Sequence, residues 1–425
     1  MAESSGYWGG LVATDSPVRY RALFGKSEFR ALFFAHSVSI VGDQFARVAL
    51  SVLVFDRTGS PAWTALTYGL TFLPDLVGGP LLSGLADRHP RRGLMVTVDL
   101  TRMLLVAAMA VPGAPLWVVC VLLVAVQLIG APANAARGAL LPAVLGEDHY
   151  PAGQAVMQTV TQAAMVLGFA GGGALVATIG TSGVLLADAG TFLLSATLVW
   201  WLVRPRPVPE ADGPSGSAAR RTWWTDLTHG AGLVWTDLRL RALVLFACAS
   251  GFYIAGEALA VPYADALGGG AVLVGFMFAA YAAGAAAGML LVARLPLPAR
   301  LRLLSPLALG ACVPLVVCFT DPHLVLVVLL FVASGAGSAY QVIASTSFVL
   351  AVPDERRGQA FGLAVTALRV AQGLGVMLAG LAAEVAAPHQ VVGSAGLLGV
   401  LAVLAIGWTW RTAGGHAHTL NASRA

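Results

Sequence analysis

Several charged residues lie deep inside long apolar stretches of this chain. Asp75 lies twelve residues before Asp87, which is about 18 Å of helix, and Asp43, Glu257 and Arg369 lie at similar depths in their own stretches. Ionisable groups near the centre of a bilayer are candidates for function. Asp75 and Glu257 have no cation within four residues on the same helix. We therefore expect these acids to bind and release protons at the centre of a membrane protein.

Other charges can pair within one helix. Asp43 and Arg47 are four residues apart and Asp99 and Arg102 are three apart, and both spacings place the two side chains on one helix face. Asp99 is only about 9 Å inside the end of its helix, so we interpret Asp99 and Arg102 as a structural pair that reaches toward the membrane surface. Asp43 and Arg47 either pair in the same way or face a proton and substrate cavity together with Gln341.

The remaining polar residues give weaker signals. Asp188 falls near the outer end of its apolar stretch, where solvation or packing is at least as good an explanation as function. His36 has no second histidine at a metal-ligand spacing, so no metal or other cofactor is expected. The cysteines lack the paired spacings of zinc and redox sites and are interpreted as small buried apolar residues: Cys120, Cys248, Cys312 and Cys318.

Composition identifies the elements that position these residues. Of the 425 residues, 58% are hydrophobic and 11% are charged, whereas soluble domains average about 25% charged residues. The net charge of +4 does not favour binding to nucleic acid. Because about 20 apolar residues cross a bilayer as a helix, the sequence predicts an all-α polytopic protein with twelve membrane-spanning helices. The apolar windows are 31–55, 62–83, 94–112, 116–137, 153–178, 182–203, 238–264, 270–293, 303–319, 323–348, 359–386 and 391–411.

Basic residues predict the orientation of these helices. Short cytoplasmic loops collect lysine and arginine, and 21 of the 25 basic residues fall in segments that alternate onto one side. Both termini are therefore expected in the cytoplasm of a cell with the chain in its inner membrane, and no signal peptide is expected. The predicted division is a cytoplasmic segment at 1–30, a six-helix bundle at 31–203, a cytoplasmic linker at 204–237, a second bundle at 238–411 and a tail at 412–425.

The two predicted bundles share a short sequence echo. Gly153-Gln154-Ala155 in the first half recurs as Gly358-Gln359-Ala360 in the second, about 205 residues later. Duplicated halves that enclose a central site are common in transporters. We therefore expect two pseudo-symmetric six-helix bundles.

The loop after the second window carries a family resemblance. Residues 83–92 read SGLADRHPRR, which resembles the signature loop Gly-x-Leu-Ala-Asp-Arg-x-Gly-Arg-Arg of the major facilitator superfamily. Flanking residues resemble its enterobactin-exporter and macrolide-efflux branch. The resemblance implies that Asp87 caps the start of the eleventh helix and closes the cytoplasmic side. The alternative is a loop whose cations only set topology. The implied gate residues are Asp87, Arg88, Arg91, Arg92 and Arg137.

A glycine run in the fifth window resembles an element of the antiporters in this superfamily. Gly168, Gly172 and Gly173 match the glycines of Gly-Pro-x-x-Gly-Gly, while Phe169 stands in the place of the proline. Small residues also let helices pack closely in a bilayer, which explains the glycines without antiport.

Three functions are compatible with these features. The leading hypothesis is a secondary exporter of an amphipathic small molecule such as an antibiotic, drug or siderophore, driven by proton antiport and working as a monomer in the lipid bilayer. A uniporter or importer of a small nutrient on the same fold is the first alternative. A membrane receptor or a membrane-embedded enzyme is the second, but no nucleophile and base pair or metal cluster is visible, so the chain is not expected to be an enzyme.

Overall fold

The computed structural model describes residues 20–72, 74, 89–146, 149–206, 235–352 and 357–422, and these residues are helical apart from short connections. In the first half, the helices are α1 (Tyr20–Gly25), α2 (Ser27–Thr58), α3 (Pro61–Leu70), α6 (Arg91–Met109), α7 (Leu116–Leu145) and α8 (Tyr150–Leu202). In the second half, they are α10 (Leu238–Cys248), α11 (Ser250–Ala258), α12 (Ala260–Ala266), α13 (Ala271–Ala293), α14 (Leu297–Val316), the 3₁₀ turn η2 (Val317–Thr320), α15 (Leu324–Gly337), α16 (Tyr340–Ala351), α17 (Arg357–Ala382) and α18 (Pro388–Ala422).

The helices confirm an all-α membrane protein whose twelve predicted spans fit the observed elements. Within the described residues, nine helical stretches are long and apolar enough to cross a membrane. One of them, α8, contains two spans, because Gly180 adopts a left-handed conformation with φ of 72° and breaks the helix between the predicted fifth and sixth windows. α3 begins the predicted second span, and α6 forms the predicted third span.

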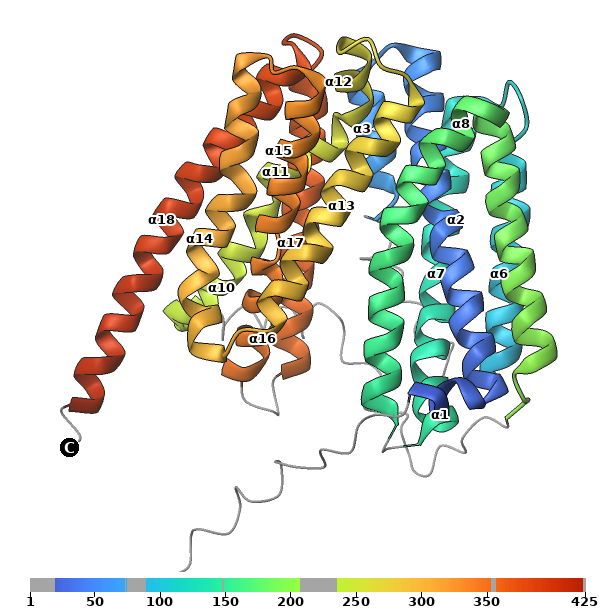
Figure 1. Cartoon of the computed structure of the whole chain (residues 1–425), viewed down its shortest axis with the longest axis horizontal. Helices are drawn as coiled ribbons and strands as arrows, with labels where there is room; N and C mark the ends of the chain where they lie inside the picture. The colour runs from blue at the N-terminus through green and yellow to red at the C-terminus, as the bar shows by residue number, and fades with distance from the viewer. Residues whose placement is uncertain are drawn as a thin grey trace, which may run out of the picture.

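The two halves of the chain form two helix bundles that lie side by side (Figure 1). α1 and the last turns of α18 lie at one end of the molecule, which we call the near end. The first residues of α3 and the helix α12 lie at the opposite end, the far end, where the bundles approach each other most closely. An even number of spans explains why both ends of the described chain lie on the same side.

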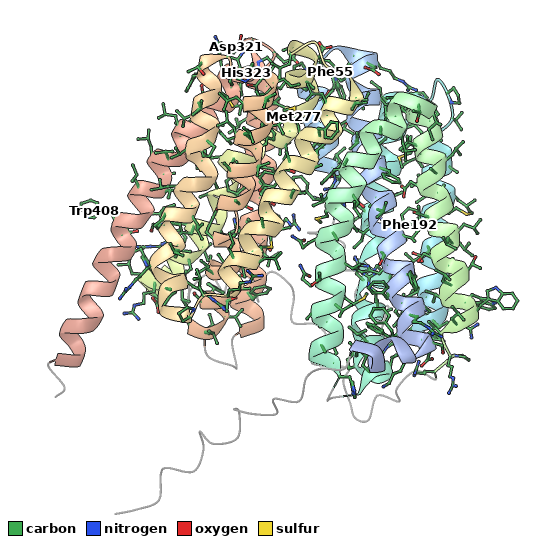
Figure 2. The ribbon with its side chains drawn as sticks, viewed as in Figure 1. Phe55, Phe192, Met277, Asp321, His323 and Trp408 are labelled. Carbon is green, nitrogen blue, oxygen red and sulfur yellow. The ribbon has the colours of Figure 1, made fainter. Side chains whose placement is uncertain are left out.

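Apolar side chains fill the bundles and also cover their outer faces. Phe192 is fully buried inside the N-terminal half, while Trp408 points away from α18 on the outer surface and is 73% exposed (Figure 2). Large exposed apolar residues such as Leu104 and Leu378 would be costly in water but match a hydrocarbon environment. A smaller set of polar side chains is buried inside the bundles, including Asp99, Arg102 and Asp188.

Candidate functional site

A cavity of about 340 Å³ runs through the N-terminal half, and its walls carry most of the buried charge of that half. Its lining comes from α2, α6, α7 and α8, together with Thr71. We call it the N-half cavity. The lining extends from Leu32 to Leu50 on α2, which corresponds to about 27 Å of helix. Its ionisable lining residues are His36, Asp43, Arg47, Asp99, Arg102, Arg137 and Asp188.

Asp43 and Arg102 form an ion pair across this cavity. The Arg102 Nη2 atom donates to Asp43 Oδ1 at 2.9 Å, and the guanidinium lies 4.2 Å from the ring centroid of Phe192. The side chain of Arg102 is 11% exposed and that of Asp43 is 33% exposed, so the arginine is held in the bundle while the carboxylate faces open space. Asp43 lies sixteen residues into the 32-residue helix α2, which places it at mid-depth.

This pairing differs from the one expected from sequence spacing. Asp99 is buried and accepts a hydrogen bond from Ser195 Oγ at 2.7 Å, while Arg102 pairs with Asp43 on another helix. Asp99 and Arg102 are 6% and 9% exposed, so neither reaches the membrane surface. The physical reason is that both lie on the inward face of α6, where neighbouring helices offer partners that a single-helix argument does not include.

Asp188 lies beside this pair, although the sequence suggested a position near the outer end. It is 1% exposed and accepts a hydrogen bond from Thr191 Oγ1 at 3.2 Å. A Cβ atom on Gly42 would lie only 2.3 Å from Asp188 Oδ1, so the carboxylate packs against the backbone of α2 next to Asp43. Among the described residues Asp188 has no ion-pair partner within 4 Å. The cavity therefore brings Asp188 within the electrostatic field of both Asp43 and Arg102.

Several buried polar atoms around the N-half cavity have no hydrogen-bond partner among the described residues. They include Gln44 Oε1, Arg102 Nε and His36 Nδ1, and the side chains of all three residues line the cavity. The other ring nitrogen of His36 lies 3.0 Å from Thr161 Oγ1. Buried polar groups of this kind are normally satisfied by water or by a ligand. The cavity is therefore suited to hold water or a polar group.

Glu257 lies between the two halves. The hydroxyl group of Tyr68 on α3 donates to Glu257 Oε2 on α11, and the Tyr68 ring stacks on Phe278 of α13 with centroids 5.8 Å apart. The Arg47 guanidinium lies 5.9 Å from the centroids of both Tyr68 and Phe169. Arg47 thus faces the aromatic group around Glu257, and in the part of the chain that the structure describes Asp43 pairs with Arg102 and not with Arg47. Tyr68 was missed by the sequence analysis, because a tyrosine in an apolar run carries no distinguishing signal.

Two other predicted cavity residues are held within or beside the C-terminal half. Gln341 donates through Nε2 to the carbonyl oxygen of Ala247 at 3.0 Å and contacts the hydroxyl groups of Tyr253 and Tyr340. Arg369 donates to Gln372 at 3.3 Å and lies 5.7 Å from the ring centroid of Phe72 in the N-terminal half. Asp75, the remaining predicted proton-binding residue, lies outside the described residues.

The C-terminal half contains a larger cavity of different character. It measures about 660 Å³ and lies between α10, α11, α17 and α18. Apart from Ser394, its lining consists of apolar side chains, glycines and Cys248. Buried carboxylates are thus concentrated in the N-terminal half and in the Glu257 contact, while the C-terminal half offers an apolar surface.

Comparison with known proteins identifies the family to which this chain belongs. The sequence profile of the Major Facilitator Superfamily matches residues 32–302 and 246–424. The chain belongs to the Major Facilitator Superfamily. It is 30% identical over 267 residues to YvqJ, an uncharacterized MFS-type transporter of Bacillus subtilis (strain 168), and the match covers 61% of this chain and 63% of YvqJ. This matched region is therefore less than two thirds of the length of that relative.

Two further similarities cover most of the chain. It is 24% identical over 376 residues to the multidrug efflux pump Tap of Mycobacterium bovis (strain BCG / Pasteur 1173P2), which covers 84% of this chain and 87% of Tap. A POT family transporter crystallised with a thioalcohol-conjugated peptide superposes with a TM-score of 0.71 at 11% identity, covering 91% of this chain and 96% of that one. The second similarity shows the fold alone.

The predicted gate arginines that the structure describes contact their own half of this superfamily member. Arg91 Nη1 donates to the carbonyl oxygen of Ala139 at 3.0 Å, and Arg92 donates to the carbonyl oxygen of Trp200 and lies over its ring. Arg137 donates to Asn134 Oδ1 at 2.5 Å and lines the N-half cavity. Asp87 and Arg88 lie outside the described residues, so the gate stays a prediction.

The glycine run of this superfamily member packs α8 against two other helices. A Cβ atom on Gly168 would lie 2.8 Å from Gln44 Cβ, and one on Gly172 would lie 3.3 Å from the Phe45 backbone, both on α2. A Cβ atom on Gly173 would lie 2.5 Å from the carbonyl oxygen of Ala271 and 2.8 Å from Gly275 Cα. The run thus allows close contact with α2 and, across the two halves, with α13.

Proposed function

We propose that this transporter exports an amphipathic small molecule in exchange for protons, with the two bundles alternately opening the site to either side. In this proposal the near end faces the cytoplasm, both termini are cytoplasmic, and the chain lies in the inner membrane as a monomer. The basic loops support the orientation, since cytoplasmic loops collect lysine and arginine. Similarity to a multidrug efflux pump over 84% of the chain supports export of a drug-like molecule.

One observation carries the proton-coupling part of the proposal. Asp188 packs against Gly42, the residue next to Asp43, so both carboxylates line the N-half cavity at mid-depth, and Arg102 forms an ion pair with Asp43 alone among the described residues. An uncompensated carboxylate in a membrane interior is costly, and a bound proton removes that cost. We propose that this carboxylate pair holds a proton in one part of the transport cycle and releases it in another.

The Glu257 contact supplies a route from the proton site to the motion of the bundles. Tyr68 donates to Glu257 across the two halves, and Arg47 lines the N-half cavity while it faces the ring of Tyr68. A change of charge in the cavity therefore acts on a contact that joins the bundles. A ligand or proton can shift a conformational equilibrium only through such a difference in interaction between two states.

Proteoliposomes test this proposal. We would reconstitute purified protein into vesicles and impose an inward or outward pH gradient. The transported probes would be ethidium, a permanent cation, and erythromycin, an amphipathic weak base. We expect the pH gradient alone to drive accumulation of at least one probe, with no nucleotide present. Asp43→Asn and Asp188→Asn should abolish gradient-driven accumulation but leave exchange of probe between the two sides intact.

Asp265→Asn is the matched control, because Asp265 is an exposed acid at the far end and does not line the N-half cavity. It should transport as the unmodified protein does. Accumulation that is unaffected by Asp43→Asn and Asp188→Asn would refute the proton assignment. Probe movement that only equilibrates across the membrane, whatever the pH gradient, would indicate a uniporter.

A further inference from the structure

A carboxylate of the C-terminal half caps a helix of the N-terminal half at the far end. Glu384 follows α17 by two residues, and its Oε1 atom accepts hydrogen bonds from Ser60 Oγ at 2.5 Å and from the backbone N–H of Ala62 at 3.0 Å. Ser60 is the N-cap residue of α3, and its own hydroxyl oxygen accepts from the N–H of Trp63 at 3.2 Å. Glu384 and Ser60 therefore satisfy the first turn of α3 together.

The helices α3 and α17 touch along the same face just below this contact. A Cβ atom on Gly380 would lie 2.5 Å from Ala65 Cβ and 3.1 Å from Ala62 Cα. Glu384 follows Gly380 by four residues, so the carboxylate continues the face on which the two helices are closest. There is no space for the helices to approach further, and any opening of the far end must separate Glu384 from the first turn of α3.

Electrostatics favours this contact while the far end is closed. The first N–H groups of a helix have no partner within the helix and carry a partial positive charge, which an ionised carboxylate stabilises. Hydrogen bonds to an ionised group are also stronger than those between neutral groups. Glu384 is exposed to solvent, so water replaces part of this interaction when the bundles separate. The expected effect is a few-fold change in the equilibrium between the closed and open states of the far end.

We propose that Glu384 is a positioning residue that holds the far end of the transporter closed through the first turn of α3. The proposal rests on the alternating-access part of the proposed function but on none of its proton coupling. Loss of the carboxylate charge shifts the equilibrium toward a state open at the far end by about two- to five-fold, the range for a charge at a solvent-exposed helix terminus. Glu384 does not contact the N-half cavity, so its effect on transport is indirect.

Spin-label distance measurements on the full chain in lipid nanodiscs test the proposal without a substrate or a pH gradient. Labels at Val111 and Leu324 report the separation of the two halves at the far end. Val111 follows α6 and is 56% exposed, and Leu324 begins α15 and is 43% exposed. We would replace the four native cysteines with alanine. Glu384→Gln should raise the ratio of long to short distances about two- to five-fold.

Ser60→Ala removes the other partner and provides a double-mutant cycle. We expect Ser60→Ala to raise the same ratio and the double variant with Glu384→Gln to raise it no further than the larger single effect. Glu384→Asp, which keeps the charge, should recover at least part of the original ratio. Two distance populations in an unchanged ratio in Glu384→Gln would overturn the role of Glu384 alone. A single population in every protein would overturn both that role and alternating access.

Discussion

Removing the arginine that holds Asp43 should move the pH dependence of transport by a predictable amount. The Arg102 and Asp43 atoms lie 2.9 Å apart, and at an effective dielectric constant of about 20 their attraction is about 6 kcal/mol. Because the Asp43 side chain is 33% exposed, we reduce this by half for solvent screening, to about 3 kcal/mol. That energy corresponds to about two pH units, at 1.36 kcal/mol per unit.

The proposed variant is Arg102→Met, which keeps an unbranched apolar stem and removes the charge. Without Arg102 the Asp43 carboxylate loses its ion-pair partner, so the charged form of the cavity is less stable relative to the protonated form. The assay is the initial rate of probe exchange in proteoliposomes held at equal pH on both sides. We expect the acidic limb of the rate profile to shift by about two units toward alkaline pH.

The double variant Asp43→Asn with Arg102→Met is the control, because it removes both charges of the pair and strands neither. Its profile should lose the acidic limb instead of shifting it, because Asp43 is part of the proposed proton site. A shift of less than half a unit in Arg102→Met alone would refute the reasoning. The refutation would mean that Arg102 does not set the charge state of the transport cavity.

Three further predictions follow from contacts between the halves. Hydrogen bonds from the Ser60 hydroxyl and the Ala62 N–H lower the pKa of Glu384 from its ordinary value of 4.5. The ionised carboxylate therefore favours the closed far end above that pH, and this advantage is lost as the pH falls through the lowered pKa. Distance measurements should show more opening of the far end in acid, and Glu384→Gln should not show this pH dependence. Gly173→Ala places a Cβ atom 2.5 Å from a carbonyl oxygen and should cost the closed contact about 1–3 kcal/mol, seen as a longer far-end distance, while Gly190→Ala, with open space at its Cβ, should not. Tyr68→Phe keeps the ring stack but removes the hydroxyl group that donates to Glu257. The contact between the halves should lose about 1–3 kcal/mol. Probe transport should slow, while the amount of inserted protein stays unchanged.

The sequence was sufficient for the helices because hydrocarbon imposes a simple rule on length and composition. The gap between the predicted windows 153–178 and 182–203 falls on Gly180, where the structure breaks α8. The predicted seventh window, 238–264, is instead three helices in series, because the chain leaves helical geometry at Leu259 and changes helix after Cys248. Apolarity determines that a segment is buried in lipid, and it does not determine where a buried helix bends.

The partners of the charged residues could not be predicted from spacing. Spacing along one helix identifies neighbours on that helix, and it predicted Asp99 with Arg102. The observed pair joins Asp43 on α2 to Arg102 on α6, which depends on the rotation of each helix in the bundle. Asp188 was assigned to the outer end of its span by counting, but it reaches the cavity because Gly42 leaves space for its carboxylate.

Direct measurement of proton release on substrate binding tests the central claim. Purified protein in a weakly buffered solution with a pH-sensitive dye would be titrated with ethidium, or with whichever probe moves most strongly in the vesicles. The account predicts that the unmodified protein releases protons as the probe binds and that the variant carrying both Asp43→Asn and Asp188→Asn binds the probe without releasing them. Equal proton release from the two proteins, or probe binding by the unmodified protein with no release, would contradict it.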